Sequence, residues 1–436
     1  MSNFQIALSV IFGFAFLLAV AIFSGFIKIP DRNAGGIEGA TGQVVMWGTI
    51  DDGAFRDTIE DFNRNKDYSL RYIEKKSSTF DAELIEALAS GKGPDLVLVS
   101  QDMLWKYKNK AYVIPYEGYS ERVFLDTFIP ESEIYLVKEG ILALPFTVDP
   151  LVLYYNKNTF TSTGIVSYPK TWTELVNIVP LLVEKDASGN IIRGAIGMGS
   201  FTNVTHAKEI LATLFLQSGV DITSYDRTTG ELDAAIKSTS NNSSVAEQVT
   251  EFFTNFTDPV LSTYTWNTAL PESRDAFIAG DLAMYIGYAS EVESIRAKNP
   301  NLDFDVAPIP QLDNTKTKVT FGDMKGIMIM NASKNRNTAY VVGALLSGNE
   351  FLSSFTPGLN LPPVRRDLLV SRPIDPILSI FYTEALISRG WIDPSSIKTT
   401  DIFSRLVKNI TSGIYEPSQA VSLANEELSL FLKSGI

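Results

Sequence analysis

The sequence predicts an α/β chain of two domains, with helices on the faces of a parallel sheet and one apolar segment at the N-terminus. Short apolar runs alternate with amphipathic helical patterns, which is typical of a parallel sheet covered by helices. Roughly 395 residues follow the N-terminal segment and its linker, enough for two domains. Hydrophobic residues make up 45% of the chain and aromatic residues 11%, so large cores are possible.

The N-terminal segment, residues 4–27, contains no charged side chain and is long enough to cross a bilayer as a helix. We expect an uncleaved transmembrane anchor there and a Gly-rich linker at 28–42. A cleaved signal is the main alternative, but the n-region lacks Lys and Arg and no clean cleavage site follows. A buried helix is the third interpretation of this segment. Lys28 and Arg32 follow the apolar run, and by the positive-inside rule they favour a cytoplasmic body.

The first strands and helices of the body alternate regularly. Residues 43–47 form an apolar run after a glycine, which indicates a buried strand. Phe55, Ile59 and Phe62 then share one helical face. A strand-like run, a second helix closed by a glycine and a second buried strand follow, at residues 70–74, 80–91 and 93–100. In such sheets ligands bind beyond the carboxyl ends of the strands, here near residues 47–51 and 100–102.

Proline marks the middle of the chain. Residues 141–156 read as two extended runs broken by Pro145 and Pro150, so we expect an edge strand or a segment that crosses between domains. Thr171 and Glu174 have the spacing of a capping box before an apolar helix. Further helices are predicted near 206–217, 244–256, 271–280 and 336–347, strands near 281–287, 304–310 and 325–330, and a helical region from 381 onward.

Composition excludes several classes of function. The net charge of −13 would repel a polyanion, so nucleic acid is not expected as a partner. Cysteine is absent, which removes disulfides, thiolate chemistry, Cys-based zinc sites and lipid attachment through cysteine. His206 is the single histidine, so Ser-His-Asp catalysis or a His-rich metal site would depend on it alone. We expect no cofactor and no metal.

Several segments in a fixed order carry a resemblance to a known family. They are VVMWGTIDD, GKGPDLVLVSQDML, GILALPFTVDPLVLYYNKNTF, YPKTWTEL, AFIAGDLAMYIGYAS, FDVAPIPQL and GLNLPPVRRDLL, spread over residues 43–430. Each is weak alone, but in this order the chain resembles the extracellular solute-binding proteins of ABC importers, of the maltose- or sugar-binding type (family 1).

The resemblance implies a two-lobed fold like that of periplasmic binding proteins, class II type, with lobes that close on a ligand. It assigns residues 43–147 and 308–348 to the first lobe, and 149–306 and 350–436 to the second. Hinge crossings are expected near 146–149, 307–310 and 347–355.

The resemblance also suggests ligand-binding residues. Asp102 and Asp149 match acidic residues that hold ligand hydroxyls, although a helix cap and a solvated hinge carboxylate are the plainer interpretations. Trp47 matches a position near the cleft, and Tyr288 a stacking aromatic; core packing and a surface tyrosine are their alternatives. The remaining candidates are the loop residues Asn203, Trp266 and Trp391. Aromatic planes can cover the apolar faces of sugar rings, while carboxylates and amides hold the hydroxyls.

The expected function is capture without chemistry: a monomeric, membrane-anchored receptor that binds a carbohydrate outside the cytoplasm and delivers it to an ABC permease. The resemblance favours this outward body over the cytoplasmic one that the Lys and Arg count suggests. A ligand-sensing receptor subunit of the same fold is one alternative. A tethered glycoside hydrolase that uses Asp102 and Asp149 is another.

Overall fold

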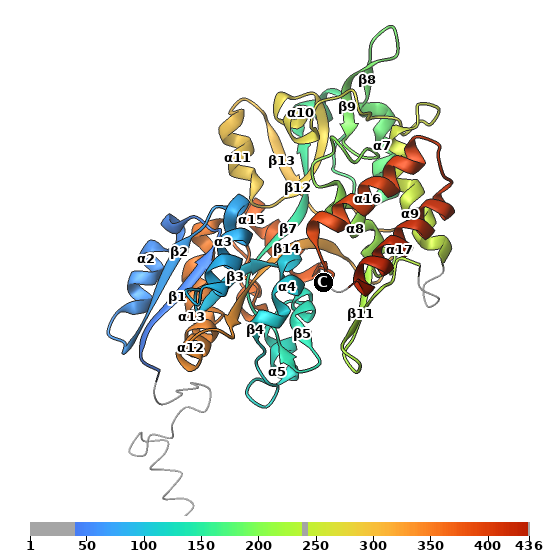
Figure 1. Ribbon diagram of the computed structural model, residues 1–436. Coiled ribbons are helices and arrows are strands. Elements are labelled where there is room, and N and C mark those ends of the chain that lie inside the picture. The colour runs from blue at the N-terminus through green and yellow to red at the C-terminus, as the bar shows by residue number, and fades with distance from the viewer. Residues whose placement is uncertain (1–39, 238–242, 435–436) are drawn as a thin grey trace, which may run out of the picture. The chain divides into compact units, whose positions relative to one another are not determined.

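The computed structural model describes residues 40–237 and 243–434 (Figure 1). Among these residues no helix is both long and apolar enough to cross a membrane, and the anchor expected at 4–27 lies outside them. Two hydrophobic clusters define two α/β lobes within residues 41–436. We call the cluster around Val44, Leu98 and Phe146 the first core, and the cluster around Leu153, Phe215 and Phe277 the second core.

The first lobe contains the N-terminal elements of the described chain and three later helices. Its elements are β1 (Gly42–Gly48), α2 (Asp52–Asn63), β2 (Tyr68–Glu74), α3 (Ser77–Ala89), β3 (Leu96–Ser100), α4 (Gln101–Tyr107), β4 (Ala111–Tyr112), α5 (Glu121–Thr127), β5 (Leu136–Val137), β6 (Gly140–Ile141), α12 (Arg336–Leu346), α13 (Asn349–Phe355) and α14 (Arg366–Leu369). The helices expected around Phe55 and Phe80 are confirmed, and Gly91 follows α3 with φ +68°.

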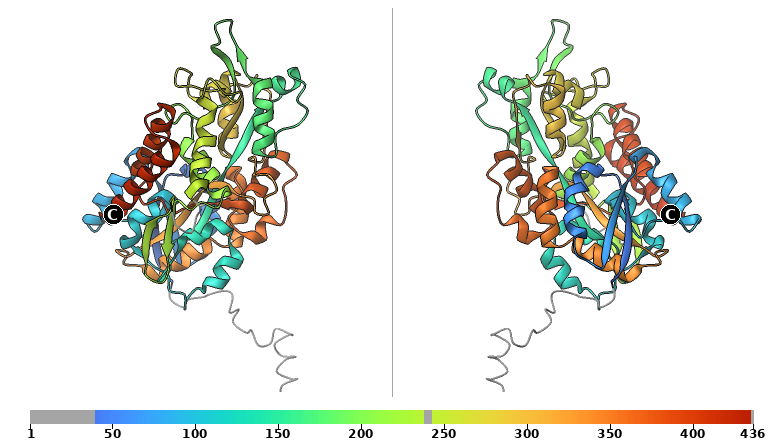
Figure 2. Two further views of the ribbon diagram at one scale, coloured as in Figure 1. Left: turned by 90° about the vertical axis from the view of Figure 1, so that its right-hand side faces the viewer. Right: turned by 90° about the vertical axis from the view of Figure 1, so that its left-hand side faces the viewer.

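The second lobe contains the middle and the C-terminal end. Its elements are α6 (Lys157–Ser162), α7 (Trp172–Leu182), β8 (Glu184–Lys185), β9 (Ile191–Ile196), α8 (Ala207–Gln217), β10 (Thr223–Asp226), β11 (Glu231–Ala234), α9 (Ser243–Thr254), α10 (Ser273–Ala279), β12 (Leu282–Tyr288), α11 (Glu291–Lys298), β13 (Phe304–Ala307), α16 (Ser396–Thr411) and α17 (Pro417–Lys433). Helices α16 and α17 lie side by side on its outer flank (Figure 2). The expected cap is confirmed, because Glu174 N donates to Thr171 Oγ1 at 3.2 Å.

Two long strands, β7 (Leu144–Asn156) and β14 (Thr320–Met330), join the lobes. Within the described residues eleven strands form one mixed sheet, whose main path runs β2-β1-β3-β14-β7-β12-β9-β8. Pairs β1–β2 and β1–β3 are parallel, whereas β7 is antiparallel to β14, β12 and β13. The parallel arrangement predicted for the first strands is confirmed, and the antiparallel strands β7 and β14 make the whole sheet mixed.

The prolines of β7 fall where its ladder is interrupted. Residues 144–150 pair with β14, and residues 151–155 pair with β12, so Pro150 lies at the change of partner. Pro145 lies opposite a register shift at Lys325 and Gly326. Because proline cannot donate to a ladder, these are positions that tolerate it. The edge-strand alternative is thus wrong, since β7 is central and crosses between the lobes.

The packing of the two cores shows that two of the three expected hinge crossings lie at later positions in the chain than the sequence predicted. The first change of core, between Val148 and Leu151, lies next to the expected crossing at 146–149. Residues 307–310 do not cross: Ala307 and Ile309 pack in the second core, and the change occurs inside β14, between Phe321 and Met324.

The third crossing, expected at 347–355, also lies later in the chain. Phe351 and Phe355 of α13 pack in the first core, where the ring centroid of Phe355 is 4.5 Å from that of Phe55. Aromatic burial therefore keeps residues 349–369 with the first lobe, and the assignment of 350–436 to the second lobe needs correction. The chain returns to the second lobe at α15 (Pro376–Ile387), which is followed by β15 (Ser388–Arg389). The packing of Phe381 of α15 in the second core shows this return.

A hairpin of the second lobe reaches the first. Tyr225 of β10 packs edge-on against Trp105 of α4, with ring centroids 5.3 Å apart, and its hydroxyl accepts a hydrogen bond from Lys138 N at 3.2 Å. Arg227 in the hairpin turn pairs with Glu121 at 2.5 Å. Contacts outside the shared strands therefore also hold the two lobes together in this conformation.

We expect Phe355→Ala to lower the free energy of unfolding by about 3–5 kcal/mol, because it leaves a cavity among packed aromatic rings of the first core. Phe355 is 1% exposed and its ring also lies 5.1 Å from that of Phe146. Urea denaturation measures the change. Ile374→Ala, at a fully exposed site, is the control and should alter stability by less than about 0.5 kcal/mol. A loss below about 1 kcal/mol for Phe355→Ala would show that α13 does not pack as described.

A second expectation concerns Glu384, which is buried on α15. Burial raises its pKa from 4.5 to about 8. The folded state therefore holds this proton to a higher pH than the unfolded state, and the free energy of unfolding falls as the pH rises from 4.5 to about 8. In Glu384→Gln the decrease in the free energy of unfolding between pH 5 and pH 8.5 should be smaller than in the parent protein by roughly 2–5 kcal/mol. Denaturation at pH 5 and pH 8.5 tests it, and parallel curves for the two proteins would contradict it.

Candidate ligand site between the lobes

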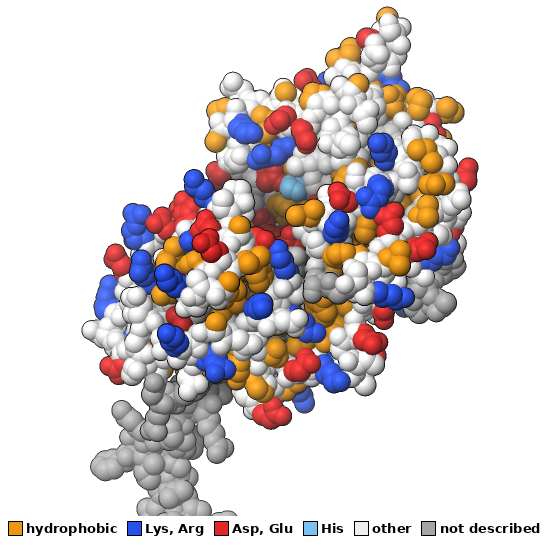
Figure 3. Space-filling model, in the orientation of Figure 1, with side chains coloured by type: hydrophobic (Ala, Val, Ile, Leu, Met, Phe, Trp, Pro, Cys, Tyr) orange, Lys and Arg blue, Asp and Glu red, His pale blue; other side chains and the backbone are white. Residues whose placement is uncertain are grey.

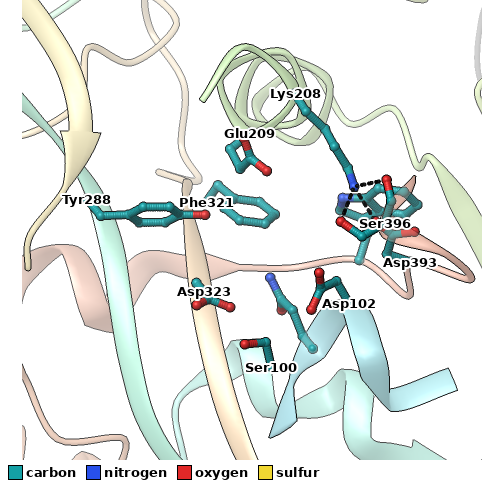
Figure 4. A pocket seen from close by; sticks show the side chains of 11 residues that line it. Ser100, Asp102, Lys208, Glu209, Tyr288, Phe321, Asp323, Asp393 and Ser396 are labelled. Atoms are coloured by element: carbon teal, nitrogen blue, oxygen red, sulfur yellow. Dashed lines mark hydrogen bonds and ion pairs between the residues drawn. The ribbon is translucent and has the colours of Figure 1, made fainter. Parts of the chain in front are cut away.

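A cavity of about 160 Å³ lies between the two cores. It is lined by residues of both lobes and of the shared strand β14: Ser100, Gln101, Asp102, Lys208, Glu209, Tyr288, Phe321, Asp323, Trp391, Asp393 and Ser396 (Figure 4). Acidic side chains and the histidine gather around the hollow between the lobes (Figure 3). The cavity therefore lies where a movement of one lobe against the other would change its shape.

The first lobe supplies the end of β3 and the start of α4. Ser100 ends the buried strand, and Gln101 and Asp102 form the first turn of the helix. Gln101 Nε2 donates to the carbonyl of Gly322 at 2.7 Å, which ties this wall to β14. Burial, with the carboxylates of Asp323 and Asp393 nearby, raises the pKa of Asp102. This is the carboxyl-end position that the sequence predicted for a ligand site.

The second lobe supplies a buried ion pair on the opposite wall. Lys208 Nζ lies 2.5 Å from Asp393 Oδ2, and the two side chains are only 8% and 4% exposed. The carboxylate of Asp393 also accepts hydrogen bonds from Ser395 N and from the hydroxyl of Thr399, each at 3.0 Å. Lys208 Nζ is 5.6 Å from the ring centroid of Trp391. Hydrogen bonds from several sides thus fix this pair in the wall.

The strands β12 and β14 supply an aromatic and acidic floor. Tyr288 and Phe321 project into the cavity, with Glu209 above them and Asp323 below (Figure 4). Asp323 pairs with Lys325 at 2.8 Å. Burial acts to lower the pKa of Lys325, but the carboxylates of Asp323, Asp149 and Asp102 outweigh it and raise that pKa.

A network of hydrogen bonds and ion pairs around Glu291 fixes the backbone and the ring of Tyr288. Glu291 Oε1 accepts from Tyr288 N at 3.0 Å and lies 2.6 Å from His206 Nε2, and Glu291 Oε2 lies 2.5 Å from Arg274 Nε. Although burial lowers the pKa of His206, Glu291 raises it above its ordinary value. His206 packs edge-on against Tyr288, with ring centroids 4.6 Å apart. The single histidine therefore positions the Tyr288 ring.

The structure brings three of the seven candidate residues together, since Asp102, Tyr288 and Trp391 all line the cavity. Asp149 is not among the lining residues: it accepts from Ser290 N at 3.0 Å, and burial raises its pKa to about 6. Trp47 also lies outside the lining, and Lys75 Nζ lies over its ring, 3.9 Å from the ring centroid. The carboxylate pair that raised the hydrolase alternative, Asp102 and Asp149, does not flank this cavity.

Two candidates lie elsewhere in the second lobe. Trp266 is 1% exposed within the second core, so its ring has no free face for stacking. Asn203 Nδ2 donates to the carbonyls of Asn267 and Leu270, each at 2.9 Å, and so fastens two loops to each other. Loop position suggested a ligand role for both, but packing and backbone hydrogen bonds occupy them.

Sequence reasoning missed most of the charged lining. Lys208, Glu209, Asp323, Asp393 and the aromatic Phe321 were not among the candidates. Asp323 had a detectable signal, because an acidic residue within the strand Thr320–Met330 is unusual unless it is paired or functional. The others depend on contacts between distant segments, which no local pattern reveals.

Two α/β lobes that share long strands and enclose a polar and aromatic cavity define the class of two-lobed, hinge-closing ligand-binding proteins. The chain belongs to the bacterial extracellular solute-binding protein family, whose sequence profile matches residues 47–350.

Known relatives are distant in sequence. A binding protein of Brucella abortus (strain 2308) is 24% identical over 292 residues, or 65% of this chain; the match spans 66% of that relative, just under two thirds of its length. The maltotriose-binding protein of Pyrococcus abyssi is 21% identical over 88% of this chain and 80% of its own. The crystal structure of the cyclic α-maltosyl-1,6-maltose-binding protein of Arthrobacter globiformis superposes with a TM-score of 0.74, at 14% identity, over 90% of this chain and 99% of that one. This last similarity concerns the fold.

We expect Lys208→Met to lower the free energy of unfolding by about 3–5 kcal/mol, because it leaves the buried carboxylate of Asp393 without its cation. Adding Asp393→Asn should restore part of that loss, since the double variant buries no unpaired charge. Urea denaturation at pH 7 measures both. Arg405→Met, which breaks the exposed pair with Glu427, is the control and should cost less than about 1 kcal/mol. A double variant less stable than Lys208→Met would argue against the pairing.

Proposed function

We propose that this protein is a receptor that captures a carbohydrate outside the cytoplasm by closure of its two lobes and delivers it to an ABC permease. The observation that carries the proposal is the cavity between the lobes, where aromatic rings of the second core and carboxylates from both lobes face one space. The family is one of extracellular solute-binding proteins, and the Pyrococcus and Arthrobacter relatives are named for the maltose-type sugars they bind. The protein acts by binding and not by catalysis.

The lining suits a sugar ring. The rings of Tyr288, Phe321 and Trp391 offer apolar surface for the C–H faces, and Asp102 and Glu209 offer acceptors for hydroxyl groups. A cavity of about 160 Å³ is close in size to one that holds a single benzene ring, and smaller than the roughly 300–1,000 Å³ of typical ligand pockets. The cavity in this conformation is too small for an oligosaccharide, which therefore requires the lobes to separate or its remaining units to extend beyond the cavity.

Two features of the fold support the proposed lobe movement. Strands β7 and β14 join the lobes, and the pairing of β7 changes at Pro150, which makes this a suitable position for a hinge. Trp105, Tyr225 and the Arg227–Glu121 pair join the lobes beyond the strands and would separate on opening. A ligand that contacts both walls binds the closed state more tightly and shifts the equilibrium toward it.

The proposal includes a membrane anchor at residues 4–27, joined to the body by the linker at 28–42. The apolar composition and length of that segment support it. An anchor would keep the loaded receptor near its permease, which is the task that lipid attachment through cysteine would otherwise perform in a chain that contains no cysteine.

Thermal melting of the purified full chain with a panel of mono- and oligosaccharides, amino acids and peptides tests the ligand class. A ligand at about 100 times its dissociation constant adds roughly 2.7 kcal/mol of stability, which raises the midpoint measurably. A shift with a sugar and no product supports the proposal. A shift with peptides or amino acids alone would replace carbohydrate as the ligand, and product formation would remove the binding-only mechanism.

We expect Asp102→Asn to weaken binding of the best sugar on the panel about 10-fold or more, because a hydrogen bond to a charged group contributes about 1.5–3 kcal/mol. Calorimetric titration measures the affinity. Asp126→Asn is the matched control: it is the same change at an exposed helical site of the first lobe, and it should leave the affinity unchanged. Equal loss in the two variants would remove Asp102 from the site.

A further inference from the structure

The lysine of the cavity and one amide N–H of its lining already have partners. The Lys208 ammonium contacts Asp393 Oδ2 at 2.5 Å and two oxygens of Ser396 at 3.4 Å, so its three donors are occupied. The amide N–H of Gln101 donates to the carbonyl of Gly322. Lys325 lies next to the cavity lining and is paired with Asp323. No basic side chain lining the cavity, within the described residues, is left to receive a ligand acceptor.

Two carboxylates of the cavity, in contrast, lack a cation. Neither Asp102 nor Glu209 forms an ion pair with any described residue, although the carboxylate of Asp102 is hydrogen-bonded to Ser396. The remaining polar groups of the lining are hydroxyls, which can donate or accept. A molecule that fills this space must therefore bring mainly donors.

The charge of the lining points the same way. Four carboxylates (Asp102, Glu209, Asp323 and Asp393) line the cavity together with a single lysine. Burial raises the pKa of the Tyr288 hydroxyl well above the ordinary value, and the negative charges of Glu209, Asp323, Asp149 and Asp102 raise it further. An anionic ligand, such as a sugar acid or sugar phosphate, would be repelled.

Aromatic rings complete the arrangement. Tyr288 and Phe321 lie close to Glu209, and Trp391 lies beside Lys208 on the other side of the cavity (Figure 4). The faces of aromatic rings attract cations, and the attraction is stronger in desolvated sites. Carboxylates and aromatic rings together are the surroundings that bind an ammonium group.

We infer that the ligand of this cavity carries a cationic amine, as an amino-substituted sugar does, and that the carboxylates of Glu209 and Asp102 hold the ammonium from opposite walls. An ammonium offers three donors and no acceptor, which matches carboxylates that have no cation. A neutral sugar hydroxyl can also donate to these carboxylates, but it brings no positive charge. The inference rests on the proposed function, because it names the substrate class of the same cavity.

Calorimetric titration of the purified full chain with three trisaccharides of equal length tests the inference: a glucosamine trimer with free amines, its fully N-acetylated form and maltotriose. We expect the free amine to bind about 10–100-fold more tightly than the acetylated form. Its affinity should also fall as salt rises from 50 to 500 mM, because a charge interaction is screened, whereas binding of the neutral sugars should not change.

Glu209→Gln and Asp102→Asn should each reduce the preference for the amine about 10-fold or more. Glu251→Gln, the same change at an exposed position of α9 in the second lobe, should keep the preference. Two variants on separate lobes keep the test valid if one of them fails to fold, which circular dichroism would show.

The outcomes separate the two proposals. Equal affinity for the free amine and the acetylated sugar, without salt dependence, overturns the inference and leaves carbohydrate capture standing. The same holds if maltotriose binds most tightly. If none of the three sugars binds, the inference fails; the proposed function fails with it only if no sugar of the melting panel raises the midpoint.

Discussion

The two lobes depend on a ladder of hydrogen bonds between two strands that belong to both cores. Strand β7 contributes Val148 to the first core and Leu151 to the second, and β14 passes from Phe321 to Met324 in the opposite order. Because each strand is anchored by burial at both ends, neither lobe can detach, and relative movement is confined to the few residues between the cores. Asp323 lies in this short segment, so an acidic side chain faces the space that both lobes enclose.

Electrostatics distinguishes the structural part of the cavity from the part that can receive a ligand. Burying a charge is costly unless a partner is present, and the Lys208–Asp393 and Lys325–Asp323 pairs meet that condition. Asp102 has no such cation, and burial, together with the nearby carboxylates of Asp323 and Asp393, raises its pKa. Under the proposed function, a cationic ligand would relieve this unfavourable charge.

Two tryptophans that both lie in loops have different roles because their surroundings differ. Trp266 and Trp391 both occur in predicted loops, yet the first is enclosed by the second core and the second faces Lys208 at the cavity. Asp102 lines the cavity and was a candidate because the carboxyl end of a buried parallel strand is a general ligand position. Asp393, 185 residues from its partner Lys208, gave no such signal.

The sequence by itself determined the alternation of buried strands and amphipathic helices, the helix caps and the exclusion of cysteine and polyanion chemistry, because these depend on neighbouring residues or on composition. Only the tertiary structure decided where the chain changes lobes and which charges meet. Residues 349–369 stay with the first core because Phe351 and Phe355 fill space there, and the cavity assembles Asp102, Glu209 and Asp323 from segments far apart in the chain. Contacts of that kind are set by packing, which local patterns do not record.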